Sequence, residues 1–319
     1  ASGMVRVFGS WDLVNRGEAN SGALVFKAEH RRGYTDVPPS GLGFETGYVG
    51  LYAPPFSDQG ARLTNLYWRQ RLGEGRATIV AGLLDVTDHV DVFAMGSPWL
   101  HFGNLAFSTG SASIGLPNEA SLGIAGGVML TDNIYAVAGI SDAEADPTEP
   151  LHGFGNVTDE ANFFKSVEIG YTTGQDRLIF DNIHVTLWQT DGSEKFAVPD
   201  GWGIAASASW WVDDQWMPFI RGGWSDDAGT LLSKSVSIGL GEQPEPGPGR
   251  AVIGLGITWG EPNKDSFGPG LDDQFTGELF YRFNLGKHLA LTPSVQLIAN
   301  PALNTDDNVI SVFGLRGRL

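Results

Sequence analysis

The sequence predicts an all-β fold, a transmembrane antiparallel up-and-down β-barrel of about 16 strands. Three observations predict it. Segments of about 8–12 residues alternate in polarity along the chain, short turns and longer loops alternate between them, and Trp and Tyr gather near the segment ends. The 44 Gly among the 319 residues fit a chain with many tight turns, because glycine adopts turn angles freely.

The alternating segments follow one another at a regular spacing, and each takes about 20 residues with its connection. In chain order they occupy residues 4–13, 22–32, 43–53, 62–72, 76–86, 120–130, 134–141, 163–172, 178–189, 202–212, 216–225, 234–241, 251–259, 274–284, 289–299 and 308–319. We therefore expect residues 1–319 to form a single barrel domain.

The connections between these segments differ in length. Those after the fourth, sixth, eighth, tenth and fourteenth segments are tight and rich in Gly, Asn and Asp (72–76, 131–133, 173–177, 213–215, 285–288). Connections after odd-numbered segments are mostly longer, whereas the second and twelfth segments break the rule with turns that hold VPPSG and PEPGPG. Short turns at one end and long loops at the other are typical of an outer-membrane barrel.

Side-chain parity within the segments is the next test, because neighbouring strand residues face opposite sides. In segment 274–284, Phe275 and Leu279 share one face, and Glu278 and Arg282 share the other. A soluble β-sandwich alternates as well. The aromatic residues near segment ends favour the barrel, since such rings form girdles at membrane interfaces; they are Trp99, Trp188, Trp202, Trp210, Trp211, Trp216, Trp224, Trp259 and Tyr281.

Composition excludes several functions. A net charge of −17 argues against a nucleic-acid partner, and the absence of Cys excludes disulfides and thiolate chemistry. The six His are scattered and no catalytic motif is present, so we expect no enzyme activity, no cofactor and no metal. No run of about 20 apolar residues predicts a transmembrane helix. The first residues carry no signal peptide, which either never existed or precedes the numbering.

Two blocks of sequence resemble the OprB family of carbohydrate-selective porins. The C-terminal block is QFTGELFYRFNLGKHLALTPSVQLIANPALN (274–304) with VFGLRGRL (312–319), and the second is LTNLYWRQRL (63–72), AGLLDVTDHVDVFA (81–94) and FGNLAF (102–107). The resemblance implies a 16-stranded barrel in the bacterial outer membrane, with a water-filled channel for sugars and similar small solutes. A homotrimer and a monomer are both compatible with it.

The resemblance also implies a role for the longest connection, residues 87–119 between the fifth and sixth segments. In 16-stranded porins the corresponding loop folds into the lumen and narrows it. We expect the same here.

A sugar offers hydroxyl groups on its edges and an apolar C–H face, which charged side chains and aromatic rings can bind. We weight Arg69, Arg71, Asp85, Asp88 and Asp91 most, because they lie on or near the expected constriction. The further pore-lining candidates are Lys27, Glu29, Arg31, Trp99, Glu278, Arg282 and Arg316.

Each candidate has a structural alternative. Facing charges can pair and brace the barrel wall, and Trp99 can pack the loop against that wall instead of stacking on a sugar. The spacing of Asp85, Asp88 and Asp91 fits either a Ca²⁺ site or, as we favour, a short helical turn. Acidic residues concentrate in the loops, so we expect an acidic rim around a mixed, locally basic lumen.

Two other functions compete with the channel. A soluble secreted all-β glycan-binding protein would line a groove with its Trp residues. A barrel hydrolase would need a Ser–His–acid arrangement, which the strand faces do not place together.

Overall fold

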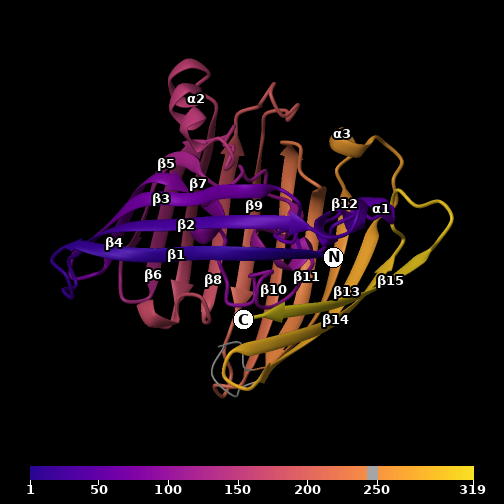
Figure 1. The fold of residues 1–319 in the computed structure, drawn as a ribbon. Coiled ribbons are helices and arrows are strands. Elements are labelled where there is room, and N and C mark those ends of the chain that lie inside the picture. The colour runs from indigo at the N-terminus through magenta and orange to yellow at the C-terminus, as the bar shows by residue number, and fades with distance from the viewer. Residues whose placement is uncertain (243–250) are drawn as a thin grey trace.

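The computed structural model describes residues 1–242 and 251–319, which form one antiparallel sheet of 15 strands in chain order. Figure 1 shows the strands side by side around the molecule, with loop segments between them. The strands are β1 (Ser2–Val14), β2 (Gly22–Gly33), β3 (Gly60–Leu72), β4 (Ala77–Leu84), β5 (Ser121–Met129), β6 (Ile134–Asp142), β7 (Phe163–Thr172), β8 (Asn182–Thr190), β9 (Gly201–Ser209), β10 (Trp216–Asp227), β11 (Leu232–Glu242), β12 (Val252–Pro262), β13 (Gln274–Leu285), β14 (Leu289–Ala299) and β15 (Val309–Arg318). The all-β prediction is confirmed.

One of the expected strands is wrong. Residues 43–53 form part of a loop that begins with the short helix α1 (Leu42–Glu45). Consecutive residues from Gly47 to Gly50 are buried there, whereas a strand would expose every second one. Proline on both sides, at 38–39 and 54–55, removes donors that a sheet needs. The strand count among the described residues is therefore 15 instead of about 16.

With residues 43–53 assigned to a loop, the lengths of the connections alternate more regularly. Short connections now follow odd-numbered strands, and the longer ones (34–59, 85–120, 143–162, 191–200, 263–273 and 300–308) follow even-numbered strands. The VPPSG segment is part of the long loop 34–59 and is no longer an exception. The PEPGPG turn lies outside the described residues. Only the four-residue connection 228–231 is short at the long-loop end among the described residues. The longest loop lies between β4 and β5, not between a fifth and a sixth strand.

Burial is inverted relative to a soluble protein. On β11, Ile238 is 53% exposed on the outer face, while Ser237 on the inner face is 0% exposed. The same alternation recurs on β7, where Val167 is exposed and Glu168 is buried. An apolar exposed face and a polar buried face are typical of a sheet whose outer side contacts lipid. A soluble glycan-binding sandwich would show the opposite order.

The aromatic residues agree only in part with the expected girdles. Trp202, Trp210 and Trp216 are exposed. Trp188 is wrong as a girdle residue, because it is 3% exposed on the inner face and packs near Phe164. Parity explains the error, since strand neighbours of Trp188 such as Leu187 point outward instead.

The remaining helices, α2 (Gly153–Asp159) and α3 (Lys264–Phe267), belong to loops at the long-loop end. None of the helices in the described residues is long and apolar enough to cross a membrane.

The edges of the sheet are β1 and β15, and no backbone pairing joins them among the described residues. Two loops bridge these edges from inside. Tyr52 of loop 34–59 contacts Ser294 of β14 at 3.1 Å between hydroxyl oxygens. In loop 85–120, the Trp99 ring lies 4.1 Å from the Arg6 guanidinium of β1, while the Pro98 carbonyl accepts from Arg316 of β15.

The inverted burial predicts the effect of a charge on the outer face. Ile257→Arg on β12 should lower the free energy of unfolding of the vesicle-inserted protein by about 2–4 kcal/mol, because the guanidinium would have to enter hydrocarbon. Urea titration of the vesicle-inserted protein, followed by tryptophan fluorescence, measures it. Ile257→Leu is the control, with a change under about 0.5 kcal/mol. Equal stability of the Arg variant and the control would contradict a lipid-facing surface.

Candidate functional site

Loop 85–120 lies inside the curved sheet, where its polar groups meet inner-face residues of many strands. Asp91 makes several of these contacts. Its carboxylate accepts from Arg221 Nη2 of β10 at 2.5 Å, contacts His184 Nε2 of β8 at 2.7 Å and accepts from the Gly110 amide at 2.5 Å. Glu168 of β7 accepts from the Asp91 amide at 2.9 Å. Because Asp91 is only 2% exposed, it holds the loop and does not face an open passage.

The middle of the loop is attached to β13. Glu278 accepts from the backbone amides of Gly103 at 2.7 Å and Asn104 at 2.9 Å, and from Gln296 Nε2 at 3.0 Å. The carboxyl group is buried, and it provides acceptors for two backbone donors that would otherwise be left unsatisfied away from water. Glu278 is thus placed as a clamp on the loop backbone.

Two arginines fasten the stretch 98–101. Arg282 donates to the Leu100 carbonyl at 3.0 Å, and Arg316 donates to the carbonyls of Pro98 at 2.5 Å and His101 at 2.7 Å. Arginine suits this task, because its several N–H donors are held in one plane. The structure therefore brings Glu278, Arg282 and Arg316 together at the loop backbone.

An apolar cluster fills the space between the loop and strands β10–β13. It consists of Phe93, Met95, Phe102, Phe107, Met217, Phe219, Val252 and Phe280, all buried. Phe102 and Phe107 stack at 4.6 Å between ring centroids. Burial of apolar area stabilises this half of the interior as a packed core. The interior beside β10–β13 is therefore filled and offers no open passage.

Loop 34–59 packs against β13, one of the strands that the apolar cluster also contacts. The Val49 amide donates to Gln274 Oε1 at 2.9 Å, and Thr276 Oγ1 lies 3.1 Å from the Tyr48 hydroxyl. Burial raises the pKa of Tyr48, so its hydroxyl stays neutral and serves as a hydrogen-bonding group. Loop 34–59 is thus a second segment, besides loop 85–120, that folds inside the sheet.

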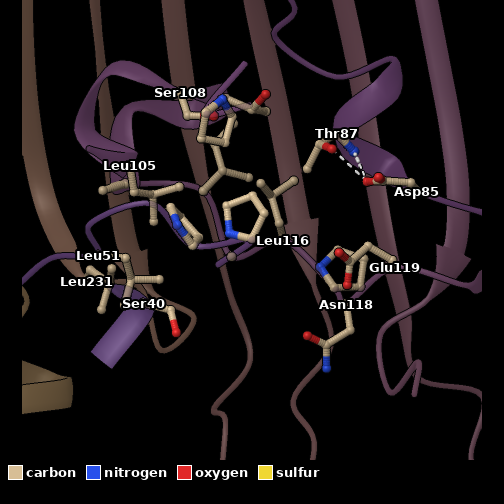
Figure 2. A pocket seen from close by; sticks show the side chains of 18 of the residues that line it. Ser40, Leu51, Asp85, Thr87, Leu105, Ser108, Leu116, Asn118, Glu119 and Leu231 are labelled. Carbon is tan, nitrogen blue, oxygen red and sulfur yellow. Dashed lines mark hydrogen bonds between the residues drawn. The ribbon is translucent and has the colours of Figure 1, made fainter. Parts of the chain in front are cut away.

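A cavity of about 1090 Å³ remains between the two loops and strands β1–β3. In Figure 2, Leu51, Leu105 and Leu231 gather on one side, and Asp85, Asn118 and Glu119 lie on the other. The lining also includes residues of the connections after β6, β8 and β10, so the cavity lies at the long-loop end.

A chain of alternating charges runs along one wall of this cavity. Arg6 Nη2 lies 2.6 Å from Glu29, Glu29 lies 2.6 Å from Arg31, and Arg31 lies 2.6 Å from Glu119. Arg62 ends the chain at 2.5 Å from Glu119. Glu29 is buried behind its two arginines. We name these five residues the charge ladder.

A second ion-pair group lies beside the ladder. Lys27 Nζ is 2.9 Å from Asp85 and 3.4 Å from Asp88, and Asn65 Nδ2 donates to Asp88 at 3.1 Å. Burial alone would raise the pKa of Asp85, but the Lys27 ammonium and bonds from Thr87 hold it below its ordinary value. Burial raises the pKa of Asp88 to about 6, and the adjacent Asp85 carboxylate adds to the rise.

The expected short helical turn is present as the 3₁₀ turn Val86–Asp88, capped by Asp85, whose side chain accepts from the Thr87 amide. Asp91 lies apart from the Asp85–Asp88 pair in its own contact set. The described residues contain no group of His, Asp and Glu suited to a metal ion.

Trp99 lines the cavity and already has ring contacts. The Arg6 guanidinium lies 4.1 Å from its ring centroid, Arg31 lies at 5.6 Å, and Phe56 is tilted against it at 5.5 Å. Such cation–π contacts hold the indole between the ladder and loop 34–59.

Arg69 and Arg71 do not lie with the other candidates. Arg69 Nη2 donates to Ser10 Oγ of β1 at 3.0 Å, and its distance to Asp12 is 4.0 Å. Both arginines lie near the tight-turn end of β3, beyond the residues that line the cavity. Although Arg69 and Arg71 are close to loop 85–120 in sequence, the structure does not place them beside it.

Sequence reasoning missed Arg6, Arg62, Gln59 and Glu119. Parity on β1 could have indicated Arg6, since Val5 and Val7 face outward. For Arg62 no simple periodicity exists, because the β2–β3 register shifts between Lys27 and Ala28 and changes the face of the residues that follow. Gln59 and Glu119 lie in loops, where alternation carries no information.

Comparisons with known proteins agree with this architecture. The family model for the carbohydrate-selective porin, OprB family, matches residues 25–196 and 197–319. No curated protein sequence matches the chain.

Solved structures give a similar fold at low sequence identity. The high-pH structure of Pseudomonas putida OprB has a TM-score of 0.76 at 15% identity, covering 99% of this chain and 87% of that one. A quintuple mutant of Rh. blastica porin has a TM-score of 0.54 at 12% identity, covering 99% and 90%. The low-pH structure of Pseudomonas putida OprB has a TM-score of 0.54 at 12% identity, covering 99% and 84%.

The Glu278 clamp predicts a looser loop when its carboxylate is removed. Glu278→Ala leaves the buried amides of Gly103 and Asn104 without an acceptor, at a cost of about 1–3 kcal/mol for each donor. Single-channel conductance in a planar bilayer should rise, and limited proteolysis should cut within 97–107. Glu278→Gln keeps an acceptor oxygen and is the control. Conductance in the Ala variant equal to that of wild type would refute the clamp.

The raised pKa of Asp88 predicts a change of ion selectivity with pH. Below about pH 6 the folded protein holds a proton on Asp88, which removes one negative charge beside Lys27. Anion permeability relative to cation permeability should therefore rise as pH falls from 7.5 to 5, measured as the reversal potential in a salt gradient. Asp88→Asn should show a smaller shift, whereas Asp307→Asn, an exposed loop carboxylate, should behave as wild type.

Proposed function

The chain belongs to the OprB family of carbohydrate-selective porins, and from this we propose that the charge ladder and loop 85–120 form the constriction of its channel. The protein is a porin of the bacterial outer membrane, through which sugars and similar small hydrophilic solutes diffuse passively. The family is normally a non-enzymatic channel, and we propose that this member catalyses no reaction.

One observation carries the proposed constriction. Loop 85–120 and the apolar cluster occupy the interior beside β10–β13, and the cavity that remains lies against the ladder arginines of β1–β3. A solute entering from the long-loop end thus meets the ladder first. This arrangement supports loop 85–120, which includes the expected 87–119, as the constriction loop.

The charges of this site are balanced. Arg6, Lys27, Arg31 and Arg62 supply four positive charges, and Glu29, Asp85, Asp88 and Glu119 supply four negative ones at neutral pH. The site is therefore mixed rather than locally basic. A neutral sugar can exchange its hydration for these fixed donors and acceptors without meeting a net field. Weak, multiple contacts allow both entry and release.

The sequence candidates divide into three groups under this proposal. Lys27, Arg31, Asp85, Asp88 and Trp99 line the passage, with Glu29 holding the arginines from behind. Asp91, Glu278, Arg282 and Arg316 hold the loop, and Arg69 and Arg71 belong to the inner wall nearer the tight turns.

We also propose that the protein assembles as a homotrimer, on the ground that porin barrels of this size often trimerise. Light scattering of the detergent-solubilised protein gives the mass, which should be three times 34.1 kDa plus detergent. A mass of one chain would leave the channel proposal standing and remove the trimer.

Liposome swelling tests the channel. Vesicles that contain the protein should swell in glucose, more slowly in a disaccharide and hardly in a large oligosaccharide, because the proposed constriction would slow larger solutes. Protein-free vesicles give the baseline. Swelling no faster than this baseline, with folded protein shown by heat-dependent gel mobility, would refute the proposed function.

A further inference from the structure

An aromatic ring stands exposed on the inner face of β1. Phe8 is 70% exposed. Its neighbours on either side fix its direction: Arg6 bonds to Glu29 through Nε at 2.7 Å, and Ser10 Oγ accepts from Arg69, both on the inner face. Residues two apart in a strand share a face, and the β1–β2 register is unbroken from Met4 to Asp12. The Phe8 ring therefore points into the interior.

Other exposed rings on the strands have an explanation that Phe8 lacks. Phe275 and Phe313 lie on the outer face, where lipid covers them. The inner rings of the apolar cluster are buried against one another, and Phe8 belongs to none of the buried clusters formed by the described residues. An apolar ring in a water-filled passage is unfavourable unless an apolar surface covers it.

Phe8 lies next to the cavity, on its tight-turn side. Arg6, one pleat away on the same face, lines the cavity, and the Cα of Phe8 pairs in register with that of Lys27. In the other direction, toward the tight turns, the same face carries Ser10 and Asp12, and Arg69 of β3 reaches both. A solute that leaves the cavity along β1 passes the ring next.

The groups around Phe8 suit a sugar ring. A pyranose has an apolar C–H face, which stacks on an aromatic ring, and hydroxyl edges, which need donors and acceptors. Arg69 uses one of its five N–H donors for Ser10, so it can also serve a hydroxyl group. Trp99, by contrast, already carries the Arg6 guanidinium.

We propose that Phe8 is a stacking subsite for the C–H face of a pyranose sugar, on the tight-turn side of the constriction, with Arg69 and Ser10 binding its hydroxyl groups. The proposal rests on the proposed sugar channel and names a specificity-determining contact within it.

The first experiment asks whether the ring position faces the channel water. The chain has no Cys, so Phe8→Cys creates a single thiol. A membrane-impermeant maleimide should label it in vesicle-inserted protein, and glucose should slow the labelling. Phe313→Cys, on the outer face and 82% exposed before lipid covers it, should remain unlabelled. An unlabelled Phe8→Cys in folded protein means that another segment or chain covers the position, and overturns the proposal.

The second experiment asks whether the ring itself selects the sugar. Phe8→Leu keeps an apolar side chain but loses the flat face, and Phe8→Tyr keeps the ring. The ratio of swelling in glucose to swelling in a linear six-carbon alditol should fall about two- to tenfold in Phe8→Leu, and should hold in Phe8→Tyr. Phe313→Leu is the matched control.

The two proposals fail in different ways. A wild-type protein that admits neither solute would refute the channel. Wild-type swelling with an unchanged glucose-to-alditol ratio in Phe8→Leu would leave the channel intact and overturn the stacking subsite.

Discussion

The inner face of the sheet carries charged side chains that cannot remain unpaired once they are buried, and this constraint places the long loop. Glu278, Arg282 and Arg316 find backbone groups of loop 85–120, and Arg221 finds Asp91. Each such bond satisfies a group whose isolation would cost more than the bond gains. Because these partners lie on β10–β15, the loop crosses the interior, and the open space is left on the opposite side.

Much of the fold could be predicted from the sequence, because strand alternation and turn chemistry are local signals. Fifteen of the sixteen expected segments are strands. The prediction of a strand at 43–53 failed because Tyr48 and Val49 are apolar for a different reason. They pack inside the sheet against β13 and β14 residues such as Gln274 and Ile298. A local pattern cannot distinguish an apolar residue of a loop that folds inward from one that faces lipid.

The site could be predicted only in outline. Parity identifies which residues face inward, and it does so correctly for Lys27, Arg31 and Glu278. It does not tell whether the interior opposite a residue holds water or protein. Arg31 meets the cavity, while Glu278 meets the loop backbone, although both are inward charges on strands. The bulge near Thr64 adds a further uncertainty, because one extra residue reverses the faces along β3.

The unpaired edges of the sheet have a mechanical consequence. An odd number of alternating strands makes β1 and β15 run in the same direction, and contacts of the two inward loops span the seam between them. Local opening begins where backbone bonds are fewest. Separation of the strands would therefore begin at this seam, and the two loops hold its edges together. A substitution that widens the passage by freeing loop 85–120 also loosens the wall, so permeability and resistance to unfolding should evolve as one trait.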